Sequence, residues 1–351
     1  MGKGLVYIFV GVALFLQTGL YAQHRHPVLK QLDSLISVDG FDAAQHIIGE
    51  VISGETTYPF LNEGRLVYPL AKSEFLLDPE TEFPKAQELL KMIRSNHEGD
   101  SIAYEALLGL GLAHIDQGSA VQAKAYITQA NRLADGLEDA QRMVASEFHL
   151  SEVGLKLGDM NQLMKRTNRA LQLMGEHPGT QFPLAPRILN YKGSLMYFTA
   201  KPDSADYYFE KAIQSIDTLN TDPEQRYYLP GTIYGNWTMV KQSENDLEKA
   251  MALTLKSIAS FNAFPEGTHN HPLTEKVRFN LSISYRNLGS LYNDFGDKEK
   301  AIQVATLGYH HSKKHFLPST VQYFSAVLMM GEAHLYGEDL QKARKYLQEA
   351  E

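Results

Sequence analysis

The chain contains no cysteine among its 351 residues. This absence excludes disulfide bridges, thiol catalysis and a lipidated N-terminal cysteine. An excess of basic residues is also absent, because 41 acidic residues outnumber 33 lysines and arginines and give a formal net charge of −8. We therefore expect no nucleic-acid partner for this chain.

Sequence motifs for catalysis and cofactor binding are missing as well. The chain has neither the GxSxG pattern of serine hydrolases nor the HExxH pattern of zinc proteases. His310, His311 and His315 lie near the end of a predicted helix, and the i, i+4 spacing of the last two can hold a metal ion. No carboxylate stands at a matching spacing beside them. We therefore expect no metal, no cofactor and no enzymatic activity.

The N-terminus has the layout of a secretory signal. Lys3 precedes the apolar stretch Leu5–Leu16, and Leu20–Ala22 offers a cleavage site before Gln23. The apolar stretch is shorter than the roughly 20 residues that a membrane span needs. We predict a signal peptide over residues 1–22 and an exported protein, periplasmic or secreted, with no membrane span after cleavage. The alternative is an uncleaved anchor that holds the protein in the membrane facing the periplasm.

The stretch NLGSLYNDFGDKEKAIQ, residues 287–303, has the pattern of two helices joined by a tight turn. The first helix has apolar residues at helical spacing: Leu288, Leu291, Tyr292 and Phe295. The second has its own amphipathic set: Ala301, Ile302, Ala305 and Leu307. Gly296 and Asp297 separate the two, while Gly289 and Ala301 are small enough for the helix backbones to approach. The stretch therefore predicts an αα-hairpin.

The small residue twelve positions before a second-helix alanine recurs along the chain. The pairs are Gly111 and Ala123, Gly193 and Ala205, Gly289 and Ala301, and Gly331 and Ala343. In the first pair Gly118 also marks the turn. One weaker copy has Gly158 at the turn with Leu163 and Ala170 behind it, and another has Thr238 on the first helix and Ala250 on the second. With Ala44 and Ala86 near the start, the second-helix markers number eight and lie 37 to 51 residues apart. The chain thus predicts about eight hairpins.

These hairpins resemble the tetratricopeptide repeat (TPR) family, in its variety with long units of about 40–42 residues rather than the usual 34. The resemblance is carried by NLGSLYNDFGDKEKAI, YKGSLMYFTAKPDSADYYFEKAI and LGLGLAHIDQGSAVQAKAYITQA. Insertions at residues 177–186 and 262–274 lengthen the units. The resemblance implies an all-α solenoid, a right-handed superhelix of hairpins forming one repeat domain over residues 23–351. It also implies a concave groove lined by the first helices, with the second helices outside.

The resemblance also implies where a ligand would bind. First helices of the fifth to seventh hairpins are the most polar on the expected groove side. The predicted groove residues are Arg187, Asn190, Tyr191, Ser194, Tyr197, Asn236, Met239, Gln242, Arg286, Asn287, Ser290 and Asn293. Asparagine amides can pair with the backbone of an extended peptide, and arginine can bind a carboxylate. The alternative is a solvated groove without a ligand.

The last predicted helix carries an apolar stripe. Its members are Leu340, Ala343, Tyr346, Leu347 and Ala350. Solenoids usually cover such a face with a polar capping helix, so we expect a covering partner or a C-terminal continuation at residues 340–351. We predict a non-enzymatic exported scaffold that binds a peptide or protein segment in its groove. The alternative is the periplasmic sensor portion of a larger signalling protein, with a kinase or DNA-binding output beyond residue 351.

Overall fold

The structure is a computed structural model that describes residues 100–217, 222–265 and 273–350. Within these ranges the chain is helical and contains no β-strand. It divides into two compact units, the first extending to Leu184 and the second beginning at Ala185. The predicted signal peptide and the first two predicted hairpins lie outside the described residues.

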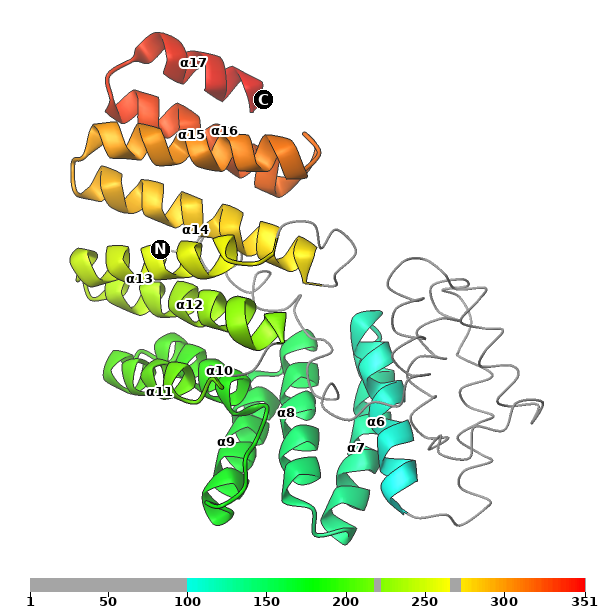
Figure 1. Ribbon diagram of the computed structural model, residues 1–351. Coiled ribbons are helices and arrows are strands. Elements are labelled where there is room, and N and C mark those ends of the chain that lie inside the picture. The colour runs from blue at the N-terminus through cyan, green and yellow to red at the C-terminus, as the bar shows by residue number, and fades with distance from the viewer. Residues whose placement is uncertain (1–99, 218–221, 266–272, 351) are drawn as a thin grey trace. The chain divides into compact units, whose positions relative to one another are not determined.

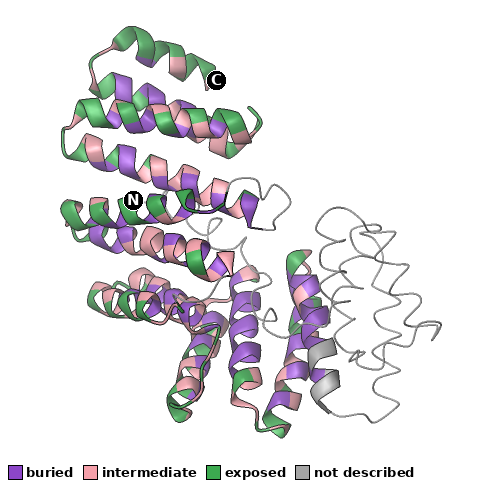
Figure 2. Cartoon of the chain, viewed as in Figure 1, coloured by how far each residue is buried: buried purple, intermediate pink, exposed green. Residues whose placement is uncertain are grey.

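The described part of the first unit consists of two antiparallel helix pairs (Figure 1). Their helices are α6 (Asp100–Asp116) with α7 (Ala120–Gly136), and α8 (Ala140–Lys156) with α9 (Met160–Glu176). Figure 2 shows buried residues along most of α8, and every residue from Val144 to Leu155 is buried. A helix without an exposed stripe is a core helix, so α8 is a core helix of the described part of this unit.

The second unit contains four helix pairs (Figure 1). They are α10 (Ala185–Phe198) with α11 (Pro202–Gln214), α12 (Leu229–Ser243) with α13 (Leu247–Asn262), α14 (Thr274–Asp294) with α15 (Lys298–His315), and α16 (Val321–Tyr336) with α17 (Leu340–Glu349). A π-helical turn, η2 (Glu224–Tyr228), runs directly into α12. The predicted αα-hairpin repeat fold is therefore confirmed over the described residues. We call the even-numbered helices α6–α16 first helices and their odd-numbered partners second helices.

All six described hairpins share one turn geometry. Each turn has three residues, and the middle one has a positive φ; these middle residues are Gly118, Gly158, Ala200, Asn245, Gly296 and Glu338. In each turn the third residue donates its backbone N–H to the carbonyl five residues earlier, as Asp297 does to Tyr292 at 2.9 Å. This is the Schellman ending of a helix, which requires a left-handed residue. Only three of the six turns place glycine there, although glycine accepts this conformation at the least cost.

Aspartate begins the second helix in four of these hairpins. Asp159, Asp246, Asp297 and Asp339 each accept a hydrogen bond from the backbone N–H three residues later. In the last three the same carboxylate also pairs with the lysine at that position, for example Asp297 with Lys300 at 2.9 Å. An N-cap of this kind stabilises a helix by about 0.5–2 kcal/mol, so in these four hairpins the turn and the cap together fix where the second helix starts.

The predicted small residues lie at close helix contacts. A Cβ on Gly111 would meet Ile127 at 2.3 Å, and one on Gly193 would meet the Phe209 ring at 2.9 Å. A Cβ on Gly331 would meet Leu347 at 2.8 Å. The positions predicted for these three seams are therefore confirmed.

Gly289 also lies at a contact, but with a different neighbour from the one expected. Its Cβ would meet the sulfur of Met329 at 3.1 Å, and Val304 only at 3.9 Å. Met329 belongs to α16, so Gly289 allows the next hairpin to approach more closely than its own second helix. Ala301 is nevertheless fully buried, as the pattern predicted.

Two apolar assignments in the seventh hairpin are wrong. Phe295 is 44% exposed because α14 ends before it, at Asp294, and leaves the ring in the turn. Leu307 is 55% exposed because α15 buries Ala301, Val304, Ala305 and Gly308, and residue 307 lies to one side of that buried face. Helical spacing identified the helices correctly, but it assigned to their buried faces two residues that are exposed.

The apolar stripe on α17 is largely engaged within the second unit. Ala343 is buried, Leu347 contacts Gly331, and Tyr346 stacks on His334 with ring centroids 5.7 Å apart. Leu340 remains 66% exposed and Leu347, despite its contact with Gly331, 38%. These contacts show that the stripe docks α17 onto α16, while the covering partner proposed for residues 340–351 stays a prediction.

Candidate peptide-binding face

The predicted groove residue Arg187 forms an ion pair inside the second unit. Its guanidinium binds the carboxylate of Glu224 in η2, and the two side chains are only 11% and 4% exposed. Tyr228, at the end of η2, is buried beside them, and its hydroxyl accepts a hydrogen bond from the amide of Asn280. Burial raises the pKa of Tyr228, with the charge of Arg187 acting in the opposite direction. The positive charge of Arg187 is thus already matched by Glu224.

Two of the predicted groove asparagines bind each other. Asn236 Nδ2 on α12 donates to Asn190 Oδ1 on α10 at 3.1 Å, and Asn190 is 6% exposed. Ser194 donates its hydroxyl to the Asn190 carbonyl at 3.1 Å. These contacts connect the fifth hairpin to the sixth, and they use amide groups that were predicted to hold a ligand backbone. Ligand roles for Asn190 and Asn236 stay predictions.

The remaining predicted residues of α10 and α12 are half-buried. They are Tyr191, Tyr197, Met239 and Gln242. Burial raises the pKa of Tyr197, so its hydroxyl remains protonated at neutral pH. These side chains lie on α10 and α12, the two helices that the Asn190–Asn236 pair connects. Their part in binding stays a prediction.

The predicted residues of α14 are the more accessible ones. Arg286 and Ser290 are exposed, and neither forms a hydrogen bond or an ion pair with any residue that the structure describes. Asn287 and Asn293 are half-buried, and the buried Oδ1 of Asn293 has no hydrogen-bond partner within the described ranges. The exposed polar groups of Arg286 and Ser290 are therefore available to an incoming segment.

The exposed side of α16 lies beside this row and was missed by sequence reasoning. Val321 and Leu335 are 59% and 51% exposed, Leu328 is half-buried and Glu332 is exposed. Residues 321, 328, 332 and 335 fall 42 positions after residues 279, 286, 290 and 293 of α14. Extending the period of 42 by one more hairpin would have found them. Val321, Leu328 and Leu335 are apolar, whereas the predicted groove residues were chosen for polar character.

We call these eight residues the α14/α16 face. Its members are Phe279, Arg286, Ser290, Asn293, Val321, Leu328, Glu332 and Leu335. The i, i+7, i+11, i+14 spacing places each set of four on one side of its helix. The two helices pack at Gly289 and Met329, and the charge of Glu332 on α16 acts on Arg286 of α14.

Electrostatics on this face centre on Arg286. Desolvation by the surrounding protein lowers the pKa of its guanidinium, while the negative charge of Glu332 acts in the opposite direction. The positive charge of Arg286 attracts an incoming anion, because no carboxylate of a described residue forms an ion pair with it.

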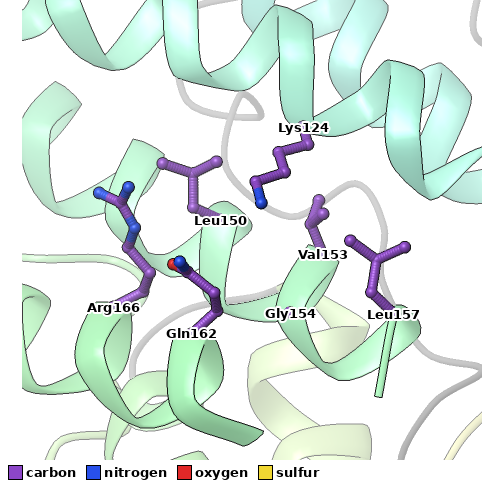
Figure 3. Close-up of a pocket in the computed structure, with 7 residues that line it drawn as sticks. All are labelled: Lys124, Leu150, Val153, Gly154, Leu157, Gln162 and Arg166. Carbon is purple, nitrogen blue, oxygen red and sulfur yellow. The ribbon is translucent and has the colours of Figure 1, made fainter. Parts of the chain in front are cut away.

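The first unit contains a small pocket between α7, α8 and α9 (Figure 3). It is lined by Lys124, Leu150, Val153, Gly154, Leu157, Gln162 and Arg166. Arg166 binds both carboxylate oxygens of Glu147, at 3.0 and 3.1 Å, and Glu147 also accepts from Asn131 at 3.3 Å. The guanidinium is thus neutralised locally. The other cation that lines the pocket, Lys124, forms no ion pair with a described residue.

The histidines considered as metal ligands have other partners. His311 Nε2 donates to the carbonyl of Arg278 at 2.9 Å, and its ring lies 4.9 Å from that of His315. Burial lowers the pKa of His311. Within the described ranges no group of three or more histidine, aspartate or glutamate side chains is arranged to hold a metal ion. The hydrogen bond instead ties α15 to α14.

No helix in the described part of the chain is long and apolar enough to cross a membrane.

No protein-family model and no curated protein matches the sequence. Solved structures do match the fold. RapI in its apo form has a TM-score of 0.61 at 15% identity, over 92% of this chain and 84% of RapI.

Two further structures show the same likeness. BtubC (BKLC) from P. vanneervenii has a TM-score of 0.56 at 18% identity, over 68% of this chain and 92% of BtubC. A Rap protein complexed with Competence and Sporulation Factor has a TM-score of 0.52 at 14% identity, over 92% of this chain and 95% of that protein. At such identities the likeness concerns the fold.

Proposed function

We propose that this chain, which has the repeat fold of TPR proteins, is a non-enzymatic scaffold that binds a segment of another protein on its first helices. The observation that carries the proposal is the α14/α16 face, where Arg286 and Ser290 are exposed without partners among the described residues beside exposed Val321 and Leu335. A surface that combines unpaired polar groups with exposed apolar side chains is typical of recognition sites.

The similar structures support this proposal at the level of the fold. One of them is a Rap protein complexed with Competence and Sporulation Factor, so a repeat protein of this architecture holds a partner. Fold alone does not establish function, and the proposal for this chain therefore depends on its own side chains.

Export is the second part of the proposal. The apolar stretch Leu5–Leu16 followed by Leu20–Ala22 supports a cleaved leader. In this proposal the scaffold acts outside the cytoplasm, in the periplasm or secreted. The absence of cysteine suits an oxidising compartment, since no thiol is there to mispair.

Site-specific photocrosslinking tests the binding proposal. Benzoylphenylalanine replaces Ser290 on the first-helix side of α14 in one variant and Leu307 on the second-helix side of α15 in another; both residues are exposed. We expect a partner from the native host to be crosslinked through position 290 and not through position 307. Crosslinking through 307 alone, or through neither position, would contradict the proposal.

A further inference from the structure

The two rows of the α14/α16 face differ in chemistry although their positions correspond. On α14 the second to fourth positions are Arg286, Ser290 and Asn293, all polar. On α16 the corresponding positions are Leu328, Glu332 and Leu335, and with Val321 three of the four α16 positions are apolar. Phe324 and Tyr336, 45% and 56% exposed, extend the apolar row at its edges. The face is therefore polar along one helix and apolar along the next.

The length of the face sets the length of a bound segment. Val321 and Leu335 are fourteen residues apart on α16, which is about 21 Å along the helix axis. An extended chain advances about 3.3 Å per residue, so roughly six or seven residues cover the face. Successive side chains of an extended chain point to opposite sides. A segment lying between the two helices therefore directs alternate residues toward α14 and toward α16.

Charge decides which polar residues suit the α14 side. Arg286 has no ion pair with any described residue, whereas Arg187 and Arg166 are bound to Glu224 and Glu147. Glu332 lies near enough to act on the pKa of Arg286 but does not form an ion pair with it. Arg286 can therefore bind a carboxylate, and Glu332 opposes that binding by like-charge repulsion.

We propose that the α14/α16 face binds an extended segment of a partner protein in which apolar residues alternate with acidic ones. The proposal rests on the proposed function and specifies the partner that this function requires. Apolar side chains of the segment lie on Val321, Leu328 and Leu335, and an acidic one meets Arg286. The α10 and α12 helices contribute less, because the Arg187–Glu224 and Asn190–Asn236 pairs already use their polar groups.

A random decapeptide library displayed on phage provides the probe. Selection uses the chain from residue 23 to 351, and parallel selections use Arg286→Gln and Leu328→Ser. Lys300→Gln and Leu307→Ser are matched controls, because they make the same chemical changes at exposed positions of the second helix α15. Thermal melting of each variant confirms that it is folded.

We expect the selected peptides to alternate apolar residues with aspartate or glutamate. A synthetic peptide of the selected sequence should bind Arg286→Gln roughly tenfold more weakly, since an ionic hydrogen bond is lost, and Leu328→Ser should weaken it as well. Glu332→Gln should bind it more tightly, because the repulsion is removed. Lys300→Gln and Leu307→Ser should bind it like the unchanged protein.

Two results would overturn the inference and leave the proposed function standing. The first is selected peptides that lack acidic or apolar residues. The second is selected peptides whose binding is insensitive to Arg286→Gln and Leu328→Ser. If no peptide is enriched and position 290 also crosslinks nothing from the host, both the inference and the proposed function fail.

Discussion

At the scale of single residues, the glycines of this chain divide into two kinds. Gly111 has no room for a methyl group, because a Cβ would lie 2.3 Å from Ile127, which is fully buried and unable to move aside. Gly136, in the last position of α7, has no atom within 4 Å of the same point. The first glycine is needed for packing, and the second is not.

This difference gives a matched pair of substitutions in the first unit. Gly111→Ala should lower the free energy of unfolding by about 1–3 kcal/mol through overpacking. Gly136→Ala should leave it unchanged or raise it by up to about 1 kcal/mol, because alanine has the higher helix propensity. Urea denaturation monitored by circular dichroism measures both. Equal effects of the two changes would show that α6 and α7 do not meet as closely as described.

The ion pair between Arg187 and Glu224 is a second feature at this scale. Both side chains are almost completely buried. Arg187→Ala leaves a buried carboxylate without its partner and should cost about 3–5 kcal/mol. The double change Arg187→Leu with Glu224→Leu should cost less than Arg187→Ala alone, because it leaves no unpaired charge.

An exposed ion pair provides the control for this prediction. Arg169 and Glu176 lie 3.6 Å apart with side chains 43% and 46% exposed, so Arg169→Ala should cost no more than about 1 kcal/mol. The same denaturation experiment compares all three variants. If Arg187→Ala were as mild as Arg169→Ala, Arg187 would be free to serve a ligand, as the sequence alone suggested.

At the scale of helices, aromatic contacts join α15, α16 and α17. Glu349 accepts hydrogen bonds from Tyr309 on α15 at 3.0 Å and from Tyr323 on α16 at 2.7 Å. Tyr346 packs edge-on against Tyr309 and lies flat on His334. The last turn of α17 thereby contacts both α15 and α16. The titratable ring of His334 lies in the contact with α16.

His334 should make this contact sensitive to acid. Burial lowers its pKa, with Lys342 acting in the same direction and Asp339 against it. A histidine whose folded pKa lies below its unfolded value of about 6.5 contributes full stability above that pH and loses it as the pH falls. His334→Phe keeps a flat ring on Tyr346 without a titrating nitrogen.

The midpoints of urea denaturation at pH 7.5, 6.5 and 5.5 test whether His334 makes the fold sensitive to acid. We expect the unchanged protein to lose more stability between pH 7.5 and pH 5.5 than His334→Phe does. His311, whose pKa burial also lowers, titrates in both proteins and cancels in the comparison. Parallel pH profiles would show that the pKa of His334 is the same in the folded and unfolded states.

The hairpins could be predicted from the sequence, but only half of the hairpin turns could. Hairpins depend on local periodicity and on small residues at a fixed distance, so Gly111, Gly193 and Gly331 were sufficient to place three seams. The hairpin turns depend on backbone geometry rather than on residue type. Gly118, Gly158 and Gly296 revealed three of them, while Ala200, Asn245 and Glu338 adopt the same positive φ without a glycine to show it.

The candidate site was harder to predict, because availability depends on contacts between residues far apart in the sequence. Arg187 and Arg286 look alike in the sequence. Glu224, 37 positions after Arg187, neutralises the first, and no described residue neutralises the second. Asn190 and Asn236 likewise pair across 46 positions. Repeat periodicity predicted Arg286, Ser290 and Asn293 on α14 but missed the α16 positions of the face, and it gave no information about these partners.

At the scale of the whole molecule, the central prediction concerns export. Cleavage after Leu20–Ala22 would give a mature chain that begins at Gln23. Mass spectrometry of the intact protein from its native host should therefore find residues 1–22 missing. A control in which Ala22 is replaced by a bulky residue, Ala22→Trp, should slow that cleavage. Recovery of the uncleaved chain from the cytoplasm would remove the basis for a periplasmic or secreted scaffold.

The three-residue hairpin turn described above also bears on how the chain reaches its fold. Each second helix returns directly along the helix before it, so most contacts join residues that are close in sequence. Chains of low contact order fold rapidly, because little loop-closure entropy is lost before favourable contacts form. A hairpin can therefore assemble as soon as its own residues are available and then serve as the template on which the next one packs. For a protein whose export is proposed, the order in which segments emerge from the translocation channel would then match the order in which they can fold.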